Sequence, residues 1–114
     1  MKEFHVITGV PRSGSTLLCN ILNQNPDFFA SSTSPVADMA ATFTQLSSSS
    51  LEIKMAIEHD TEGTLDKLEQ MVRGMIETWY ADKEGTVFDK GRGWSYNASL
   101  LAHLFPEAKI IACV

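Results

Sequence analysis

The segment at residues 4–26 restricts the possible folds more than any other part of the chain. Residues 4–8 form a short apolar run of strand-forming type. Gly9–Gly14 follows as a loop that contains two glycines and a proline. From Ser15 onward leucine and isoleucine recur at helical spacing, until Asn25-Pro26 ends the pattern. A buried strand that enters a helix through a glycine loop predicts an α/β fold.

The same loop is suited to binding an anion. The first N–H groups of a helix have no acceptors within the helix, and the helix dipole favours negative charge beside them. Gly9 and Gly14 allow the backbone to curve so that several N–H groups converge. Hydroxyl and guanidinium donors are added by Arg12, Ser13, Ser15 and Thr16. We therefore predict a phosphate-type site at residues 9–16.

The rest of the chain alternates helical and strand patterns. Loops or turns are expected at 28–35, in the serine run 47–50, and at 89–94. The expected helices cover 36–46, 51–59, 64–81 and a segment from an N-cap at Ser95 to Phe105, and the expected strands cover 86–88 and 109–114. In the helix at 64–81, the methionines and Trp79 are expected in the core. This alternation predicts a three-layer structure, in which helices bury a parallel sheet on both sides.

Composition and charge exclude several classes of function. A chain of 114 residues forms one small domain at most. Nine basic against fourteen acidic residues give a net charge of −5, which disfavours nucleic-acid binding because that requires a basic face. No apolar run reaches the roughly 20 residues that span a bilayer, and no signal-peptide core precedes Gly9. We therefore expect a cytoplasmic protein with reduced cysteines, without nucleic-acid or membrane partners, and without a metal site.

Residues 9–16 match the spacing of the P-loop of nucleotide-hydrolysing proteins, with one departure. Ser15 stands where that class has the lysine that reaches the β- and γ-phosphates. The cation of this loop is instead Arg12.

Residues 10–18, Val-Pro-Arg-Ser-Gly-Ser-Thr-Leu-Leu, resemble the 5′-phosphosulfate-binding loop of sulfotransferases that use 3′-phosphoadenosine 5′-phosphosulfate (PAPS). That family has Pro-[Lys/Arg]-Ser-Gly-[Thr/Ser]-[Thr/Ser] at its first strand–helix junction, and Asn25-Pro26-Asp27 fits the end of its first helix. Phe88-Asp89-Lys90 and residues 100–111 are similar to its middle strand, basic loop, helix and "Phe-Pro-x-Ala-Lys" start of the next strand. The resemblance implies that residues 1–114 are the N-terminal part of one sulfotransferase-like α/β domain, with the 3′-phosphate-binding residues after residue 114.

The resemblance also implies roles for individual residues. Arg12 falls where the family has a loop lysine or arginine that contacts the leaving phosphate and the sulfuryl group. Lys90 falls near a family lysine that meets the transferring sulfuryl oxygens. The cradle for the 5′-phosphate would comprise Gly14, Ser15 and Thr16, with Ser13 beside them. The implied reaction moves a sulfuryl group from PAPS to a hydroxyl or amine of a small-molecule or peptide acceptor, and it needs no metal.

The physical chemistry of the loop agrees with such a reaction. In an in-line sulfuryl transfer, negative charge grows on the leaving phosphate, and fixed cations and N–H donors aimed there lower the barrier. We expect Arg12, Lys90 and Arg92 to gather at the strand ends and to form a basic pocket in an acidic chain.

A general base for the acceptor does not carry over from the family. Its protein-tyrosine branch has a glutamate shortly after the first helix, where this chain has only hydroxyl residues at 31–34. Its small-molecule branch has a histidine two residues after the basic-loop lysine, where this chain has Arg92. Asp89 and Asp38 remain as candidates, and the three histidines are expected to be structural or on the surface.

Two other functions stay open. A P-loop kinase or NTPase is favoured by Thr86–Asp89, because an apolar run that ends in aspartate is typical of a strand end that holds Mg²⁺. The absent P-loop lysine disfavours it. A non-catalytic relative that only binds anions is suggested by the absent base.

Overall fold

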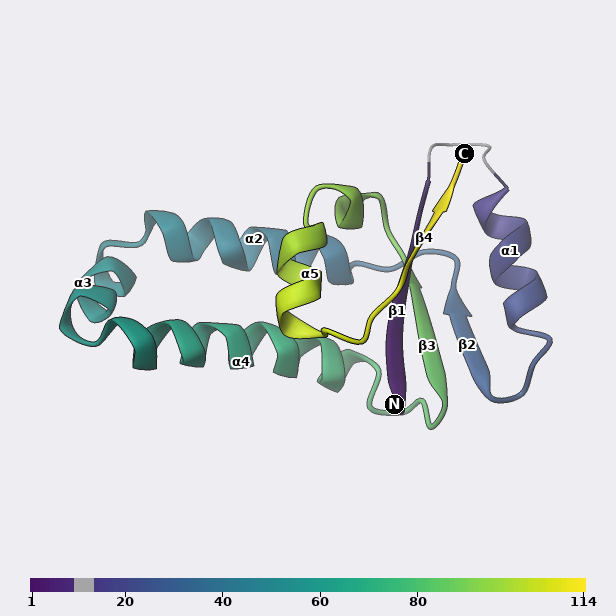
Figure 1. Ribbon diagram of the computed structural model, residues 1–114, viewed down its shortest axis with the longest axis horizontal. Helices are drawn as coiled ribbons and strands as arrows, with labels where there is room; N and C mark the ends of the chain where they lie inside the picture. Colours follow the sequence, from purple (N-terminus) through teal and green to yellow (C-terminus); the bar gives the residue numbers. More distant parts are fainter. Residues whose placement is uncertain (10–13) are drawn as a thin grey trace.

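The computed structural model describes residues 1–9 and 14–114. It contains a parallel sheet with helices on both faces (Figure 1). The strands are β1 (Glu3–Gly9), β2 (Phe28–Ser31), β3 (Thr86–Lys90) and β4 (Ile110–Cys113), in the order β2-β3-β1-β4. The predicted α/β class, the parallel sheet and the three-layer arrangement are confirmed.

Helices of different length cover the two faces. On one face lies α1 (Ser15–Leu22), and on the other lie α2 (Val36–Ser49), α4 (Thr61–Trp79) and α5 (Ala98–Leu104). Far from the sheet, α3 (Leu51–His59) joins α2 to α4, and a short 3-10 turn, η1 (Arg92–Ser95), follows β3. Among the described residues, no helix is both long and apolar enough to cross a bilayer.

The alternation of side chains along β1 divides the core into two parts. Phe4 and Val6 pack with the side chains of α2, α4 and α5, whereas Ile7 packs with Cys19 of α1. Both parts are buried, so β1 is apolar on both faces, as a central parallel strand must be.

The carboxyl ends of the four strands lie along one edge of the sheet, because every strand pair is parallel. The chain leaves β1 toward α1 on one face and leaves β2 toward α2 on the other. Ligands of open parallel sheets bind at this edge, where successive connections go to opposite faces.

The expected loop at 28–35 is wrong in its first half. Phe28–Ser31 forms β2 and pairs with β3. The two phenylalanines favour a strand, and Ala30 is buried against the α1 face of the sheet.

The expected turn at 47–50 is also wrong, because α2 continues to Ser49. The hydroxyls of Ser47, Ser48 and Ser49 donate to carbonyls four residues earlier, so these serines fit within a helix. Only Ser50 interrupts the helix, and its Oγ accepts from the N–H of Ile53, 3.3 Å away, to cap α3.

The segment after residue 85 differs from the prediction in three places. β3 runs on to Lys90, so Asp89 lies in the sheet rather than in a loop. Ser95 does not cap α5: its Oγ donates to the Arg92 carbonyl, and α5 begins at Ala98. The strand predicted at 109–114 is present as β4, but Ile110 is 44% exposed because β4 is the outer strand of the four.

The prediction that the methionines and Trp79 of α4 belong to the core is wrong in part. Trp79 and Met71 are 50% and 57% exposed, whereas Val72 and Ile76 are buried. The first half of α4 runs beyond the sheet (Figure 1), so only a narrow stripe of its later turns meets the strands. The aromatic residue that enters the core here is Tyr80.

Replacing Ile76 by alanine tests this narrow stripe. Ile76 is fully buried, so we expect Ile76→Ala to lower the free energy of unfolding by about 2–5 kcal/mol, through lost apolar burial and the cavity left behind. Met71→Ala, on the exposed side of the same helix, should change it by no more than about 0.5 kcal/mol. Urea denaturation measures both, and equal losses would contradict this assignment of faces.

Candidate functional site

A cavity of about 600 Å³ lies at the edge where the strands end. Three chain segments line it, and each leaves the carboxyl end of a different strand. The described lining residues are Gly9, residues 14–16, residues 32–34 and residues 90–92. Segments far apart in the sequence meet here because parallel strands end at a common edge.

Four of the predicted site residues line this cavity: Gly14, Ser15, Thr16 and Lys90. The other two, Arg12 and Ser13, lie outside the described residues. The Nζ of Lys90 donates to the Oγ1 of Thr16, 3.0 Å away. The end of β3 and the start of α1, which the sequence analysis singled out separately, are therefore in contact.

The N-terminus of α1 borders the cavity. Gly14 is the N-cap, with φ 88° and ψ 7°, a left-handed conformation that glycine adopts without steric cost. Its carbonyl accepts from the N–H of Leu18, 3.0 Å away, so the helix starts directly after it. The first turn of α1 carries no acidic side chain. The positive end of the helix dipole is thus free to stabilise an anion in the cavity.

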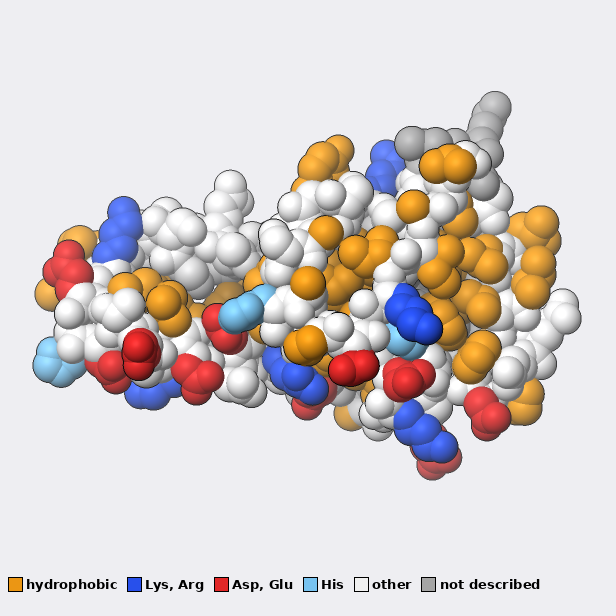
Figure 2. Space-filling model, viewed as in Figure 1, with side chains coloured by type: hydrophobic (Ala, Val, Ile, Leu, Met, Phe, Trp, Pro, Cys, Tyr) orange, Lys and Arg blue, Asp and Glu red, His pale blue; other side chains and the backbone are white. Residues whose placement is uncertain are grey.

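The cavity is basic although the chain is acidic. Of its described lining residues, Lys90 and Arg92 are cations and none is a carboxylate. Figure 2 shows acidic side chains, interspersed with Lys and Arg, along the helical projection and at the opposite edge of the sheet. A local positive field in a chain of net charge −5 favours an anionic ligand.

Asp89 and Lys90 are neighbours in β3 and point to opposite faces of the sheet. Lys90 reaches toward α1, whereas Asp89 is fully buried on the other side. Tyr80, directly after α4, donates its hydroxyl proton to one carboxylate oxygen of Asp89. The Nε1–H of Trp94 in η1 donates to the other, 2.7 Å away. Asp89 therefore ties β3 to α4 and to η1.

The position of Asp89 removes two of its predicted roles. It does not line the cavity, and both oxygens already have partners within the protein, so it neither touches an acceptor directly nor holds Mg²⁺ there. Burial raises the pKa of its carboxyl, and hydrogen bonds from Ser34, Tyr80 and Trp94 offset part of that rise. Asp38 is exposed on α2 and is likewise absent from the lining.

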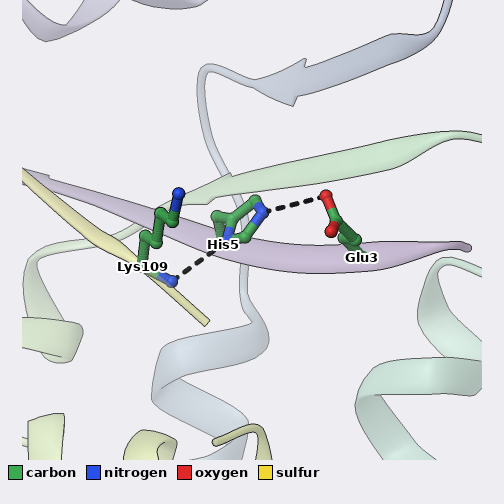
Figure 3. Close-up of polar contacts among 3 residues, drawn as sticks. All are labelled: Glu3, His5 and Lys109. Atoms are coloured by element: carbon green, nitrogen blue, oxygen red, sulfur yellow. Dashed lines mark hydrogen bonds and ion pairs between the residues drawn. The ribbon is translucent and has the colours of Figure 1, made fainter. Parts of the chain in front are cut away.

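The histidines lie away from the cavity, in agreement with a structural or surface role. The Nδ1 of His5 accepts from the backbone N–H of Lys109, 3.0 Å away, and its Nε2 lies 3.4 Å from a Glu3 carboxylate oxygen (Figure 3). His5 thereby joins β1 to the segment that leads into β4. His59 and His103 are on α3 and α5.

The sequence analysis missed two contributors to the site. Residues 32–34 line the cavity, although they drew attention only as a place without a carboxylate. Their signal is a run of hydroxyl residues directly after a strand. Tyr80 is the second, because its hydroxyl contacts both Asp89 and Ser34. Nothing in the local sequence distinguishes Tyr80 from an ordinary core aromatic.

A second cavity, of about 620 Å³, lies at the opposite edge of the sheet, around the first residues of β1. Its lining includes Arg73, which is paired with Glu77 and with the Leu104 carbonyl. None of the predicted site residues that the structure describes (Gly14, Ser15, Thr16 and Lys90) borders it. Among the described residues, no group of three or more His, Cys, Asp or Glu side chains is placed to hold a metal ion.

Two glycine substitutions test the start of α1. Gly14→Ala meets no neighbouring atom but forces alanine to φ 88°, so we expect it to lower the free energy of unfolding by about 1–2 kcal/mol. Gly74→Ala, in the middle of α4 and also free of neighbours, should raise it by roughly 0.5–1 kcal/mol. Chemical denaturation distinguishes the two signs, and a stabilising Gly14→Ala would contradict the left-handed cap.

The raised pKa of Asp89 predicts a pH dependence of stability. The folded state holds the Asp89 proton more tightly than the unfolded state. The contribution of Asp89 to the free energy of unfolding is therefore largest at low pH, and it falls as the pH rises from 3.8, the ordinary pKa of aspartate, through the raised pKa of the folded state. Asp89→Asn should lack this fall, since its amide can accept from Trp94 and donate to Tyr80 without titrating. Urea unfolding of the parent and of Asp89→Asn, measured over this pH range, gives the difference in their free energies of unfolding. A difference that does not change with pH would refute the prediction.

Comparison with protein-family models matches residues 6–114 to the sulfotransferase family. A search of curated proteins gives no match. The matched range includes the α1 loop, the three strands that follow β1 and all the described residues that line the cavity. The family indicates a transferase that takes a sulfuryl group from a sulfonate donor. Because the match covers nearly the whole chain, the protein belongs to the sulfotransferase family.

Proposed function

We propose that the protein transfers a sulfuryl group from PAPS to a hydroxyl or amine of a small-molecule or peptide acceptor. The observation that carries this proposal is the contact between Lys90 and Thr16. It brings a cation from the end of β3 to the anion-binding start of α1, within one cavity. We further propose, from the resemblance, that residues 1–114 are the N-terminal part of a single sulfotransferase domain.

The residues of the cavity fit an anionic donor of this kind. An added Cβ on Gly14 would meet no atom within 4 Å, so the space beside the helix start is open to a ligand. The Thr16 hydroxyl and the N–H groups of the first turn of α1 are suited to hold the 5′-phosphate, with Ser15 and Ser13 beside them. When bound, PAPS supplies an activated sulfuryl group and a phosphate leaving group.

The cations would act on the charge that develops during transfer. Lys90 is positioned to hold the sulfuryl oxygens, because its ammonium already lies beside the helix start. By the resemblance, Arg12 would neutralise the leaving phosphate. Fixed donors of this type are stronger catalysts than solvent because they need no reorganisation as the charge moves. Arg92, which also lines the cavity, strengthens the same field.

A P-loop kinase or NTPase receives less support. Magnesium prefers carboxylate and other oxygen ligands, and the strand-end Asp89 that favoured this reading is committed to Tyr80 and Trp94. The described residues that line the cavity include no carboxylate. A requirement for Mg²⁺ in nucleotide binding would favour the kinase or NTPase instead. Binding of adenosine 3′,5′-bisphosphate without any transfer would favour a non-catalytic relative.

Substitution of Lys90 tests the proposal with two ligands. Because Lys90 would contact the sulfuryl oxygens, Lys90→Ala should weaken binding of PAPS by about tenfold or more. Its effect on adenosine 3′,5′-bisphosphate, which has no sulfuryl group, should be much smaller. Lys67→Ala, which removes an exposed charge on α4, is the matched control. Calorimetry gives the affinities, and equal effects on the two ligands would contradict the assigned role.

In a longer protein that includes the 3′-phosphate-binding residues expected after residue 114, Arg12→Ala should abolish sulfuryl transfer and leave the fold intact, since its proposed role lies in the transition state. Transfer of labelled sulfate from PAPS to 4-nitrophenol reports activity, and circular dichroism reports the fold. Undiminished turnover would refute the role of Arg12.

A further inference from the structure

The side chain of His5 takes part in the pairing of two strands. β4 is the outer strand of the four and pairs only with β1 among the described residues. At the entry to β4, the carbonyl of Lys109 accepts from the N–H of Val6, 3.0 Å away. The N–H of Lys109 donates to the Nδ1 of His5, also 3.0 Å away. A side chain of β1 thus supplies the acceptor for the backbone N–H that precedes β4.

This contact fixes the protonation state of the ring. A backbone N–H can only donate, so Nδ1 of His5 carries no proton and the single proton of the neutral ring lies on Nε2. Nε2 lies 3.4 Å from a Glu3 carboxylate oxygen, to which it can donate (Figure 3). His5 is only 8% exposed, so solvent has little access to either nitrogen. The neutral ring with its proton on Nε2 therefore satisfies both neighbours.

We propose that His5 makes the attachment of β4 to β1 dependent on pH. When the ring takes up a proton from solvent, Nδ1 gains a hydrogen that faces the N–H of Lys109, and two donors then oppose one another. The contact between Nε2 and Glu3 becomes an ion pair within β1. Neutral His5 holds the start of β4, and protonated His5 releases it.

Few charged groups face the ring. Glu3 and Lys109 lie on either side of it (Figure 3), and β3 contributes the uncharged ring of Phe88, with the two centroids 5.4 Å apart. The helix α1, which covers this face of the sheet, contains no charged residue. The cavity at this edge of the sheet, which His5 also borders, is lined by Lys2, Arg73, Glu77 and Glu107. Among the described residues, Glu3 is the only carboxylate within ion-pair distance of the ring.

β4 is the strand that would respond to the loss of this hydrogen bond. Its residues alternate between exposed and half-buried, and none of them is buried. By contrast, β1 and β3 each have neighbours on both sides and buried residues along their length. Segments with few buried apolar contacts open locally at a lower free energy than the core. Protonation of His5 should therefore loosen β4 and leave the pairing of β1 with β3 intact.

Amide hydrogen exchange followed by ¹⁵N NMR tests the proposal. Protection is expressed relative to the intrinsic exchange rate at each pH. The protection of Lys109 and of the β4 amides should fall by about tenfold or more between about pH 8 and pH 5, the range in which histidines ordinarily titrate. The protection of the β3 amides should stay constant over the same range.

Three variants separate the role of His5 from a general effect of acid. The side-chain oxygen of His5→Asn can accept in place of Nδ1 and does not titrate, so β4 should be protected equally at both pH values. His5→Phe keeps a ring beside Phe88 but has no acceptor, so β4 should be weakly protected at both. His103→Asn is the matched control. It removes an exposed histidine that contacts Glu69, and it should keep the pH dependence of the parent. Circular dichroism verifies that each variant is folded.

The hydrogen bond is also observable directly in the parent protein. With ¹⁵N-labelled histidine, a scalar coupling between the Lys109 nitrogen and Nδ1 of His5 should be present at high pH and vanish as the ring ¹⁵N shifts report protonation. An absent coupling at high pH, a His5 that stays neutral throughout, or an equal loss of β4 protection in His5→Asn would overturn the proposal. These measurements need no PAPS and no acceptor, so their outcome is independent of the proposed function.

Discussion

The hydrogen-bonded carboxylate of Asp89 is the interaction on which the architecture of the site depends. Its partners are Tyr80, directly after α4, and Trp94 in η1, and through Tyr80 it reaches the segment after β2. Removing one partner would leave a buried polar group unsatisfied, at a cost of about 1–3 kcal/mol or more. Residues 32–34 and 90–92, which line the cavity, both lie next to the hydrogen bonds of Asp89 and Tyr80. The shape of the cavity therefore depends on these hydrogen bonds.

The cation and the buried carboxylate of the site lie on opposite faces of the sheet. On the α1 face, Lys90 and the helix start create a field for an anion. On the other face, Asp89 is fully buried and is hydrogen-bonded to Tyr80 and Trp94. Keeping the acid and the cation on separate sides prevents them from forming an ion pair, which would neutralise both. The cavity at the strand ends is the place where the two sides meet.

Much of the fold could be predicted from the sequence because its signals are local. The apolar run before Gly9, the helix after it and the strand at the end of the chain follow from periodicity and from breaker residues. The errors arose where tertiary contacts decide. Phe28–Ser31 is a strand because β3 lies beside it, and Asp89 is tolerated in a strand because Tyr80 and Trp94 satisfy it.

The candidate site was predictable to a similar extent. The glycine loop and Lys90 carry their own chemical signals, and the structure brings Gly14, Ser15, Thr16 and Lys90 to one cavity. The contribution of Tyr80 could not be predicted, because it depends on where α4 ends relative to the sheet. Trp79 has the stronger apolar signal, yet it is half exposed while Tyr80 is buried.

The opposite orientations of Asp89 and Lys90 make the length of β3 critical. Side chains of a strand alternate, so inserting or deleting one residue before Asp89 would exchange the faces of these two neighbours. The ammonium group of Lys90 would then point into the apolar interior, and the carboxylate of Asp89 would face the anion site. Substitutions of Val87 or Phe88 by residues of similar size would be less damaging. They leave the number of residues before Asp89 unchanged, and that number decides whether Asp89 or Lys90 faces the ligand.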